Sequence, residues 1–251
     1  MNKGTKEGTE EEIKFVKVLN KDKDGKYWNI IKNSFSRKNL FAIHVIYKKH
    51  GKINEKKIMP KADIFLAYGE VSKLILKEKD YYLDENDMEK LKLTPVNHTG
   101  ISVKRPDSNR YQIMKMNPST FKKIFGNYEL GAGASIYCKR EEELEKNESV
   151  IKGWKIDNGK FNAYFKIKDK RGIKEFEDIK KISTRKIHEM IAKSKLISDF
   201  IFRGVGNFEE PYTATWFYEK GELKKAEEIP FVVTTGSGRS KGDFTIVIKP
   251  R

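Results

Sequence analysis

Two short apolar segments of the sequence each contain one charged residue. Asp63 lies within residues 61–66 (KADIFL), and Lys104 ends residues 101–104 (ISVK). An unpaired charge is costly to bury, so a charge inside such a segment needs a partner or a function. Side chains alternate along a strand, which places Ser102 and Lys104 on the same face. If the two segments are neighbouring strands, Asp63, Ser102 and Lys104 converge on one point.

This convergence predicts metal-assisted hydrolysis of a phosphodiester. The Asp63 carboxylate and the backbone carbonyl of Val103 are oxygen ligands that suit a hard cation such as Mg²⁺. Such an ion polarises the phosphate and lowers the pKa of a bound water. Lys104 would hold the attacking water and stabilise the charge of the transition state. The alternative is a buried salt bridge between adjacent strands without chemistry, and the spacing alone leaves both interpretations open.

The overall charge favours a polyanionic partner. The 251 residues include 52 Lys and Arg against 36 Asp and Glu, which gives a net charge of +16. Lys and Arg side chains that neutralise phosphates release condensed counterions, so nucleic acid is the expected partner. A lysine-rich composition with solvated faces is the plainer explanation. The 15 Phe and 11 Tyr indicate a folded core and argue against a disordered chain.

Cysteine usage and hydropathy narrow the class of protein further. Cys138 is the single cysteine, which excludes an intramolecular disulfide and a cysteine metal cluster. Neither a secretory signal nor an apolar stretch long enough to span a membrane is visible, so a cytoplasmic protein without membrane contact is expected.

The pattern of apolar residues predicts an α/β fold. Helices are expected at residues 10–20, with Thr9 as the N-cap, and at residues 84–91, 118–125 and 173–195. Strands are expected at residues 41–47, 62–68, 100–104, 154–167, 200–202 and 214–218, with residues 73–76 as a possible extension or partner. Residues 231–235 and 244–248 are expected to form a final hairpin.

The motif around Asp63 and Lys104 resembles the core of the PD-(D/E)XK nucleases. It is most similar to the small type II restriction endonucleases that cut four-base sites, the MspI and Hin-type relatives. In that group an amide replaces the acidic residue before the lysine, and here the position holds Ser102, while Pro60 stands three residues before Asp63. The resemblance implies a central mixed β-sheet flanked by helices, with Asp63, Ser102 and Lys104 as catalytic residues and Mg²⁺ as cofactor.

The resemblance also implies a further acidic residue from the first helix. Glu10 is the candidate for this catalytic position, with Glu11 and Glu12 as alternatives. A glutamate that faces solvent near the start of a helix is the other interpretation.

Several polar residues are candidates for contact with DNA. Arginine suits guanine, and asparagine or glutamine suits adenine. The segment after Lys104, a late stretch similar to the same relatives, and the glycine-rich loop of residues 236–242 contain such groups. The candidates are Arg105, Asn109, Arg110, Gln112, Arg203, Asn207, Arg239, Ser240 and Lys241.

These observations predict a sequence-specific enzyme that cleaves double-stranded DNA. Residues 1–140 would form the nuclease core, and residues 141–251 an elaboration for DNA recognition that packs with the core as one unit. A monomer or homodimer is expected, together with a cognate DNA methyltransferase in the same system. The alternatives are a repair or nicking nuclease of the same fold and a non-catalytic basic DNA-binding protein.

Overall fold

The structure, a computed structural model, describes residues 3–31, 37–44, 52–53, 56–57, 60–83, 85–105, 111–167, 172–235 and 244–251. The chain divides into two compact units. The first contains Met1–Asn109 and Asp199–Ile229, and the second contains Arg110–Ser198 and Pro230–Arg251. The boundary expected at residue 140 falls inside the second unit. A change of composition along the chain does not reveal which later segments return to an earlier unit.

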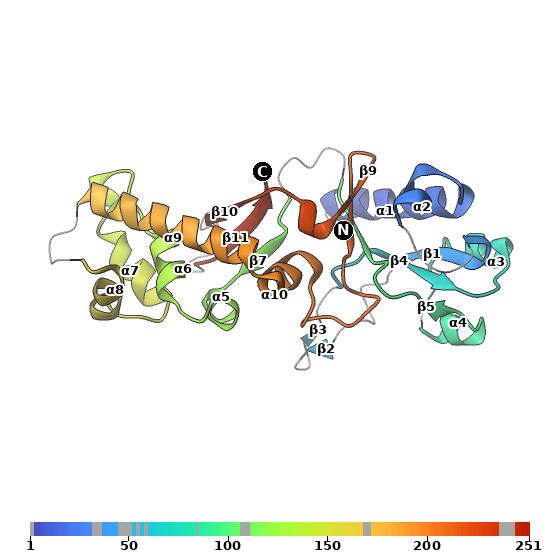
Figure 1. Ribbon diagram of the computed structural model, residues 1–251, viewed down its shortest axis with the longest axis horizontal. Helices are drawn as coiled ribbons and strands as arrows, with labels where there is room; N and C mark the ends of the chain where they lie inside the picture. Colours follow the sequence, from blue (N-terminus) through green and yellow to red (C-terminus); the bar gives the residue numbers. More distant parts are fainter. Residues whose placement is uncertain are drawn as a thin grey trace. The chain divides into compact units, whose positions relative to one another are not determined.

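The first unit contains a mixed β-sheet with helices around it (Figure 1). Its described strands follow the order β1 (Leu40–His44), β4 (Ile64–Tyr68), β6 (Ile101–Val103), β8 (Trp216–Glu219) and β9 (Glu222–Lys225), and β5 (Thr94–Pro95) pairs with β4. Neighbouring strands are antiparallel except β6 and β8, which are parallel. The expected α/β class with a central mixed sheet flanked by helices is confirmed.

Short elements complete the first unit. The helices are α1 (Lys3–Lys21), α2 (Lys26–Ile30), α3 (Lys73–Glu78) and α4 (Glu85–Lys90). Single turns lie at η1 (Arg37–Asn39), η3 (Asp199–Arg203) and η4 (Ala226–Glu228), and β2 (Lys52–Ile53) pairs with β3 (Lys56–Lys57).

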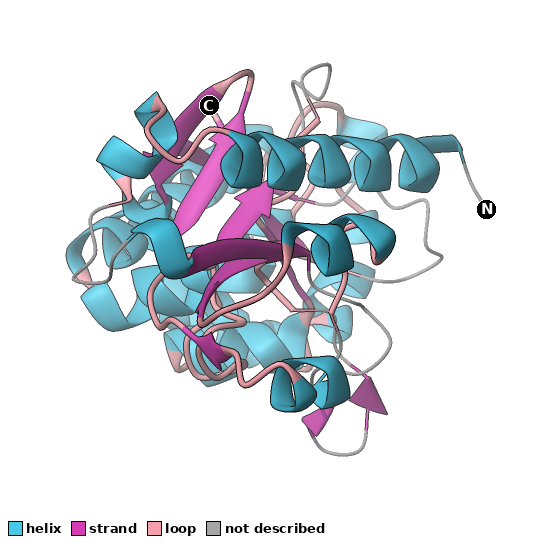
Figure 2. Ribbon diagram, turned by 90° about the vertical axis from the view of Figure 1, so that its right-hand side faces the viewer, coloured by secondary structure: helices cyan, strands magenta, loops and turns pink. Residues whose placement is uncertain are grey.

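Helix α1 packs on the sheet beside β1 (Figure 2). Phe15, Val16 and Leu19 of this helix are buried in the core of the unit. The Asn20 side chain donates a hydrogen bond to the Ala42 carbonyl and accepts one from the Ala42 amide. These two bonds occupy both backbone groups of a strand residue, so they fix the helix against β1 as well as satisfying a buried amide.

The second unit combines helices with a small antiparallel sheet of order β10-β11-β7. Its strands are β7 (Met114–Met116), β10 (Phe231–Thr235) and β11 (Ile246–Pro250). Its helices are α5 (Pro118–Phe125), α6 (Glu129–Ser135), the turn η2 (Glu141–Glu143), α7 (Lys146–Gly153), α8 (Asn158–Phe165), α9 (Ile173–Lys193) and α10 (Lys195–Ser198). The antiparallel pairing of β10 with β11 confirms the expected final hairpin.

A glycine-rich stretch in the second unit has a packing role. Gly131 lies in α6 against the fully buried ring of Trp154, and a Cβ atom at this glycine would lie 2.1 Å from that ring. Phe121 meets the same indole edge to face. The close approach of helix and indole therefore explains a glycine inside α6, where it otherwise weakens a helix.

Several expected elements are wrong. Helix α1 begins at Lys3, so Thr9 lies inside it, which shows that the glycines before Glu10 did not end the helix. Residues 73–76 belong to α3, whose first turn is capped by the Ser72 hydroxyl. Residues 154–167 contain α8, capped by the Asp157 carboxylate, and residues 200–202 belong to the helical turn η3. Short apolar runs fit either a strand or one buried helix face, and the caps decide for the helix.

The described helices include none that is both long enough and apolar enough to cross a membrane.

Candidate active site

Asp63 enters the sheet of the first unit at the beginning of β4. Its amide donates a hydrogen bond of 2.8 Å to the Ile101 carbonyl, and the next residue, Ile64, is paired with Ile101 of β6. Only 8% of Asp63 is exposed. The pairing of the two segments is therefore confirmed, and it brings a nearly buried carboxylate to the junction of β4 and β6.

Asp63, Ser102 and Lys104 form a continuous chain of hydrogen bonds. Oδ2 of Asp63 accepts a bond of 2.7 Å from the Val103 amide and one of 3.2 Å from the Ser102 hydroxyl. Nζ of Lys104 donates to the same Ser102 hydroxyl over 2.7 Å. Ser102 thus links a carboxylate to an ammonium group, and the three side chains that the sequence singled out lie together.

Strand β8 fixes the direction of Lys104. The Lys104 amide donates to the Tyr218 carbonyl, which continues the parallel pairing of β6 with β8 beyond Val103. Nζ of Lys104 lies 5.2 Å from the ring centroid of Phe217, within the range of a cation–π contact. The backbone and the aromatic face together hold the amino group toward Ser102.

Lys61 is a second lysine at this site. Its pKa is lowered to about 7, chiefly because burial disfavours the ammonium form and further because Lys104 is positive, while Asp63 acts in the opposite direction. Lys61 belongs to the motif around Asp63, but the sequence alone indicates no role for it. Its position two residues before Asp63 was the available signal, since alternate residues of an extended chain share a face.

The segment that leads into Asp63 is held by a loop of the same unit. The amides of Lys61 and Ala62 both donate to the Tyr212 carbonyl. Gly100, directly before β6, meets this loop so closely that a Cβ atom there would lie 1.9 Å from the Thr213 carbonyl oxygen. The backbone around residues 211–213 therefore sets how β4 and β6 approach each other at Asp63.

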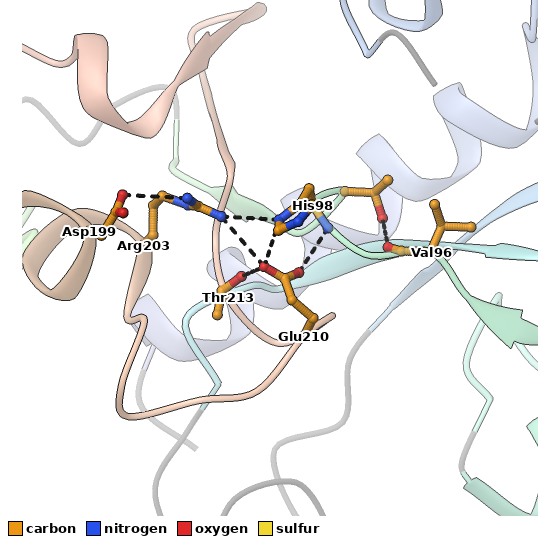
Figure 3. A network of polar contacts seen from close by, with 7 residues as sticks. Val96, His98, Asp199, Arg203, Glu210 and Thr213 are labelled. Atoms are coloured by element: carbon orange, nitrogen blue, oxygen red, sulfur yellow. Dashed lines mark hydrogen bonds and ion pairs between the residues drawn. The ribbon is translucent and has the colours of Figure 1, made fainter. Parts of the chain in front are cut away.

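A polar network stabilises this loop (Figure 3). Arg203 is paired with Asp199 at 3.4 Å and with Glu210 at 3.5 Å. Glu210 also accepts a hydrogen bond from the His98 amide and another from the Thr213 hydroxyl. The Arg203 side chain is 16% exposed, so the structure shows it engaged inside the unit. Its expected contact with DNA stays a prediction.

The three candidate glutamates of α1, Glu10, Glu11 and Glu12, have different surroundings. Glu10 is exposed, and Glu11 pairs with Lys14 on the same helix. Glu12 is 7% exposed, and its Oε2 lies 2.7 Å from Nε2 of the buried His44 in β1. Among the three candidates for a further acid, Glu12 is therefore the buried one, and its described partner is a histidine.

The donor set fits a magnesium ion only in part. Among the described residues, no three His, Cys, Asp or Glu side chains lie together in a way that could hold a metal. Asp63 offers one carboxylate, and the hydroxyl of Ser102 stands where an acid would add a second. Magnesium in proteins often uses one or two carboxylates and takes its other ligands from water and substrate phosphates. Asp63 satisfies that minimum. The Val103 amide donates to the Asp63 carboxylate, and the role of the Val103 carbonyl as a metal ligand stays a prediction.

The remaining candidates for DNA contact are distributed over both units. Arg105 and Asn207 are partly exposed in the first unit, and Gln112 is exposed in the second. Five candidates lie outside the described residues: Asn109, Arg110, Arg239, Ser240 and Lys241.

Comparison with known proteins adds no family to this description. The chain matches no protein-family model, and no curated protein is significantly similar to it. The class of the protein therefore rests on the site itself.

Proposed function

We propose that this chain is a magnesium-dependent nuclease that cuts double-stranded DNA and, within that class, a type II restriction endonuclease. One observation carries the proposal: the nearly buried Asp63 carboxylate is linked through the Ser102 hydroxyl to the Lys104 amino group. A metal-binding carboxylate beside a lysine can supply the activated water and the charge stabilisation that speed phosphodiester hydrolysis.

Asp63 would hold the metal and the reacting phosphate in place. Two hydrogen bonds, from the Val103 amide and the Ser102 hydroxyl, fix the position of its Oδ2 atom. A carboxylate fixed in this way needs little reorganisation when a cation and a phosphate approach. When bound, magnesium would supply charge neutralisation at the phosphate and a bound water of lowered pKa.

Lys104 would act on the attacking water and on the phosphate. Its bond to Ser102 and its contact with Phe217 limit the positions that its Nζ atom can take. From there, the ammonium group can donate a hydrogen bond to a water or to a non-bridging phosphate oxygen. Attack of the water oxygen on phosphorus breaks the bond to the leaving oxygen, and the added negative charge is offset by this ammonium.

The charge of the whole chain supports DNA as the substrate. The net charge of +16 favours association with a polyanion, and the residues predicted to contact DNA include arginines in both units. The proposal as a restriction enzyme further implies a uniquely positioned cut and a cognate DNA methyltransferase that protects the host DNA.

The test compares the wild type with Asp63→Asn and Lys104→Ala on mixed-sequence duplex DNA, with magnesium and with a chelator. The wild type should give discrete fragments with magnesium alone. Each variant should cut at least about 10²-fold more slowly, the usual cost of removing one group that stabilises the transition state. Lys90→Ala, an exposed lysine of α4, makes the same change of charge and should cut at the wild-type rate.

A second candidate function is DNA binding without catalysis. It is favoured because Asp63 is the one carboxylate that the described residues bring to the site as a metal ligand. In a non-catalytic DNA-binding protein, the hydrogen bonds that link Asp63, Ser102 and Lys104 would only stabilise the junction of β4 and β6. DNA that stays intact with every protein, while all of them bind it equally, would reject the nuclease and establish this second candidate.

A further inference from the structure

The second unit contains a hollow of about 730 Å³ between α9 and β10. Figure 1 shows these two elements side by side. Strand β10 pairs only with β11 among the described strands, and its residues 231–233 line the hollow. A volume of this size lies within the range of small-ligand sites.

The rim of the hollow is strongly basic. Its charged residues are one acid, Glu177, and five bases, namely Lys139, Lys180, Lys181, Arg185 and Arg251. Nζ of Lys180 donates to the Ile136 carbonyl, which anchors that side chain, and Lys181 and Arg185 are exposed one turn apart on α9. Arg185 also lies 3.8 Å from Glu189 on the same helix, and this exposed pair leaves its guanidinium open to a stronger anion. The excess of basic over acidic side chains favours an anionic ligand.

The floor of the hollow is apolar and aromatic. Phe231, Val232 and Val233 of β10 line it, and all three are half-buried. The exposed His188 ring stacks on Phe231 with a centroid distance of 4.4 Å and an angle of 17°. An exposed ring that already belongs to a stack can accept a further planar ring.

We infer that this hollow binds a nucleotide, with the base extending the His188–Phe231 stack and the phosphate between Lys181 and Arg185. Cations that contact the phosphates, together with aromatic rings that contact the bases, are the usual means of binding single-stranded nucleic acid. The ligand is either a free mononucleotide or a nucleotide within a DNA strand. This site goes beyond the proposed function, because it belongs to the unit that does not contain Asp63 and Lys104.

Cys138 makes the hollow directly testable. It lines the hollow, is partly exposed and is the single cysteine of the chain. The rate at which iodoacetamide alkylates the intact protein, followed by mass spectrometry, therefore reports on this site alone. The measurement uses the Asp63→Asn protein without magnesium, so that it does not depend on DNA cleavage.

The ligands to compare are deoxyadenosine monophosphate, a short single-stranded oligodeoxynucleotide and inorganic phosphate. At roughly ten times its Kd, a bound nucleotide should slow alkylation roughly tenfold, because the site is then empty about a tenth of the time. Protection by the mononucleotide identifies a free nucleotide as sufficient, and protection by the oligonucleotide alone identifies a DNA strand. Equal protection by phosphate, or none by either nucleotide, would overturn the inference.

Two variants separate the site from the general charge of the protein. The double variant Lys181→Ala/Arg185→Ala and the single variant Phe231→Leu should each weaken protection roughly tenfold or more. The matched control, Lys174→Ala/Lys193→Ala, removes two charges from the same helix outside the hollow and should leave protection unchanged. Equal weakening by the control would show that only the overall charge matters.

The result is independent of the nuclease test. If the hollow binds nucleotides while no variant or condition cuts DNA, the proposed function fails and this site stands. If DNA is cut but the hollow binds no nucleotide, only this inference fails.

Discussion

Ser102 is the residue that distinguishes this site from a simple ion pair. Its hydroxyl accepts a hydrogen bond from Lys104 and donates one to Asp63, so it connects the two charged groups. A hydroxyl can do this because it is both a donor and an acceptor. At the position where an acidic residue would offer a second metal ligand, this chain has a serine that bonds to both charged side chains.

Replacement of Ser102 therefore tests whether the connection matters for catalysis. Ser102→Ala should slow DNA cleavage by roughly 10- to 100-fold, because a hydrogen bond to a charged group contributes about 1.5–3 kcal/mol. Ser102→Thr keeps the hydroxyl and should retain most of the activity. Single-turnover rates at saturating magnesium make the comparison, and equal rates for the alanine and threonine variants would show that the hydroxyl has no role.

A different lysine gives the first unit a pH-dependent stability. Lys23 packs against Phe41 and donates to the Lys38 carbonyl. Its pKa is lowered from 10.5 to about 8, chiefly by burial and further by Lys73. Between these two values the unfolded chain binds a proton that the folded chain does not, so this group makes stability rise with pH from about 8 to 10.5.

Lys23→Met should remove that contribution. The free energy of unfolding in urea should then rise less steeply with pH than in the wild type across this window. Lys90→Met, at an exposed position, is the control for loss of a positive charge and should keep the wild-type slope. Parallel curves for the wild type and Lys23→Met would contradict the assignment.

At the scale of elements, the junction of β4 with β6 depends on the loop around residues 211–213. Gly100 precedes β6, and the nearest obstacles to a side chain there are the carbonyl oxygens of Thr213 and Pro211. These are backbone atoms, so a side chain at this position cannot be accommodated by rotating a neighbour. The approach of the loop is what requires glycine.

Gly100→Ala should therefore lower the stability of the protein and disturb the site together. A loss of about 1–3 kcal/mol in the free energy of unfolding is the usual cost of overpacking. Gly159→Ala, in the first turn of α8, is the control and should have a much smaller effect. A Cβ atom there would lie 3.1 Å from the Asp157 carboxylate, a side chain that can move, and alanine favours a helix. Urea unfolding measures both, and an equal effect of the two substitutions would show that the contact with the loop is not tight.

The sequence predicts some elements well because their signals are local. The pairing of residues 62–68 with residues 100–104 follows from two apolar segments that each contain a charge, and α9 follows from a long helical period. Residues 73–76 and 154–167 were predicted as strands because a short apolar run fits both periods. The N-caps Ser72 and Asp157 favour a helix in these segments. Each cap adds only one hydrogen bond, so it is a weak signal in the sequence.

The site was predictable to the same limit. Asp63, Ser102 and Lys104 lie within or beside two segments with a strand pattern. Pairing of those two strands is enough to predict that the three side chains converge. The contribution of Tyr212, which holds Lys61 and Ala62, comes from a segment about 150 residues later in the chain. The buried pair of Glu12 and His44 likewise depends on how α1 lies against β1, which a helical pattern does not specify.

At the scale of the whole molecule, charge should dominate the affinity for DNA. With a net charge of +16, binding should weaken steeply as salt rises. A protein that neutralises six to ten phosphates loses about 10³- to 10⁵-fold in affinity between about 50 and 200 mM salt. Fluorescence anisotropy with a labelled duplex, in the absence of magnesium, measures this dependence. An affinity that is insensitive to salt would contradict binding through phosphate contacts.

The site of Asp63, Ser102 and Lys104 is proposed to hydrolyse duplex DNA at a defined place. The most direct measurement is to incubate the wild type and Asp63→Asn with mixed-sequence duplex DNA and magnesium, and to sequence the ends of any fragments. We expect the wild type to leave ends with one shared sequence and Asp63→Asn to leave the DNA intact. Fragments from Asp63→Asn at the wild-type rate, or intact DNA with both proteins, would contradict it.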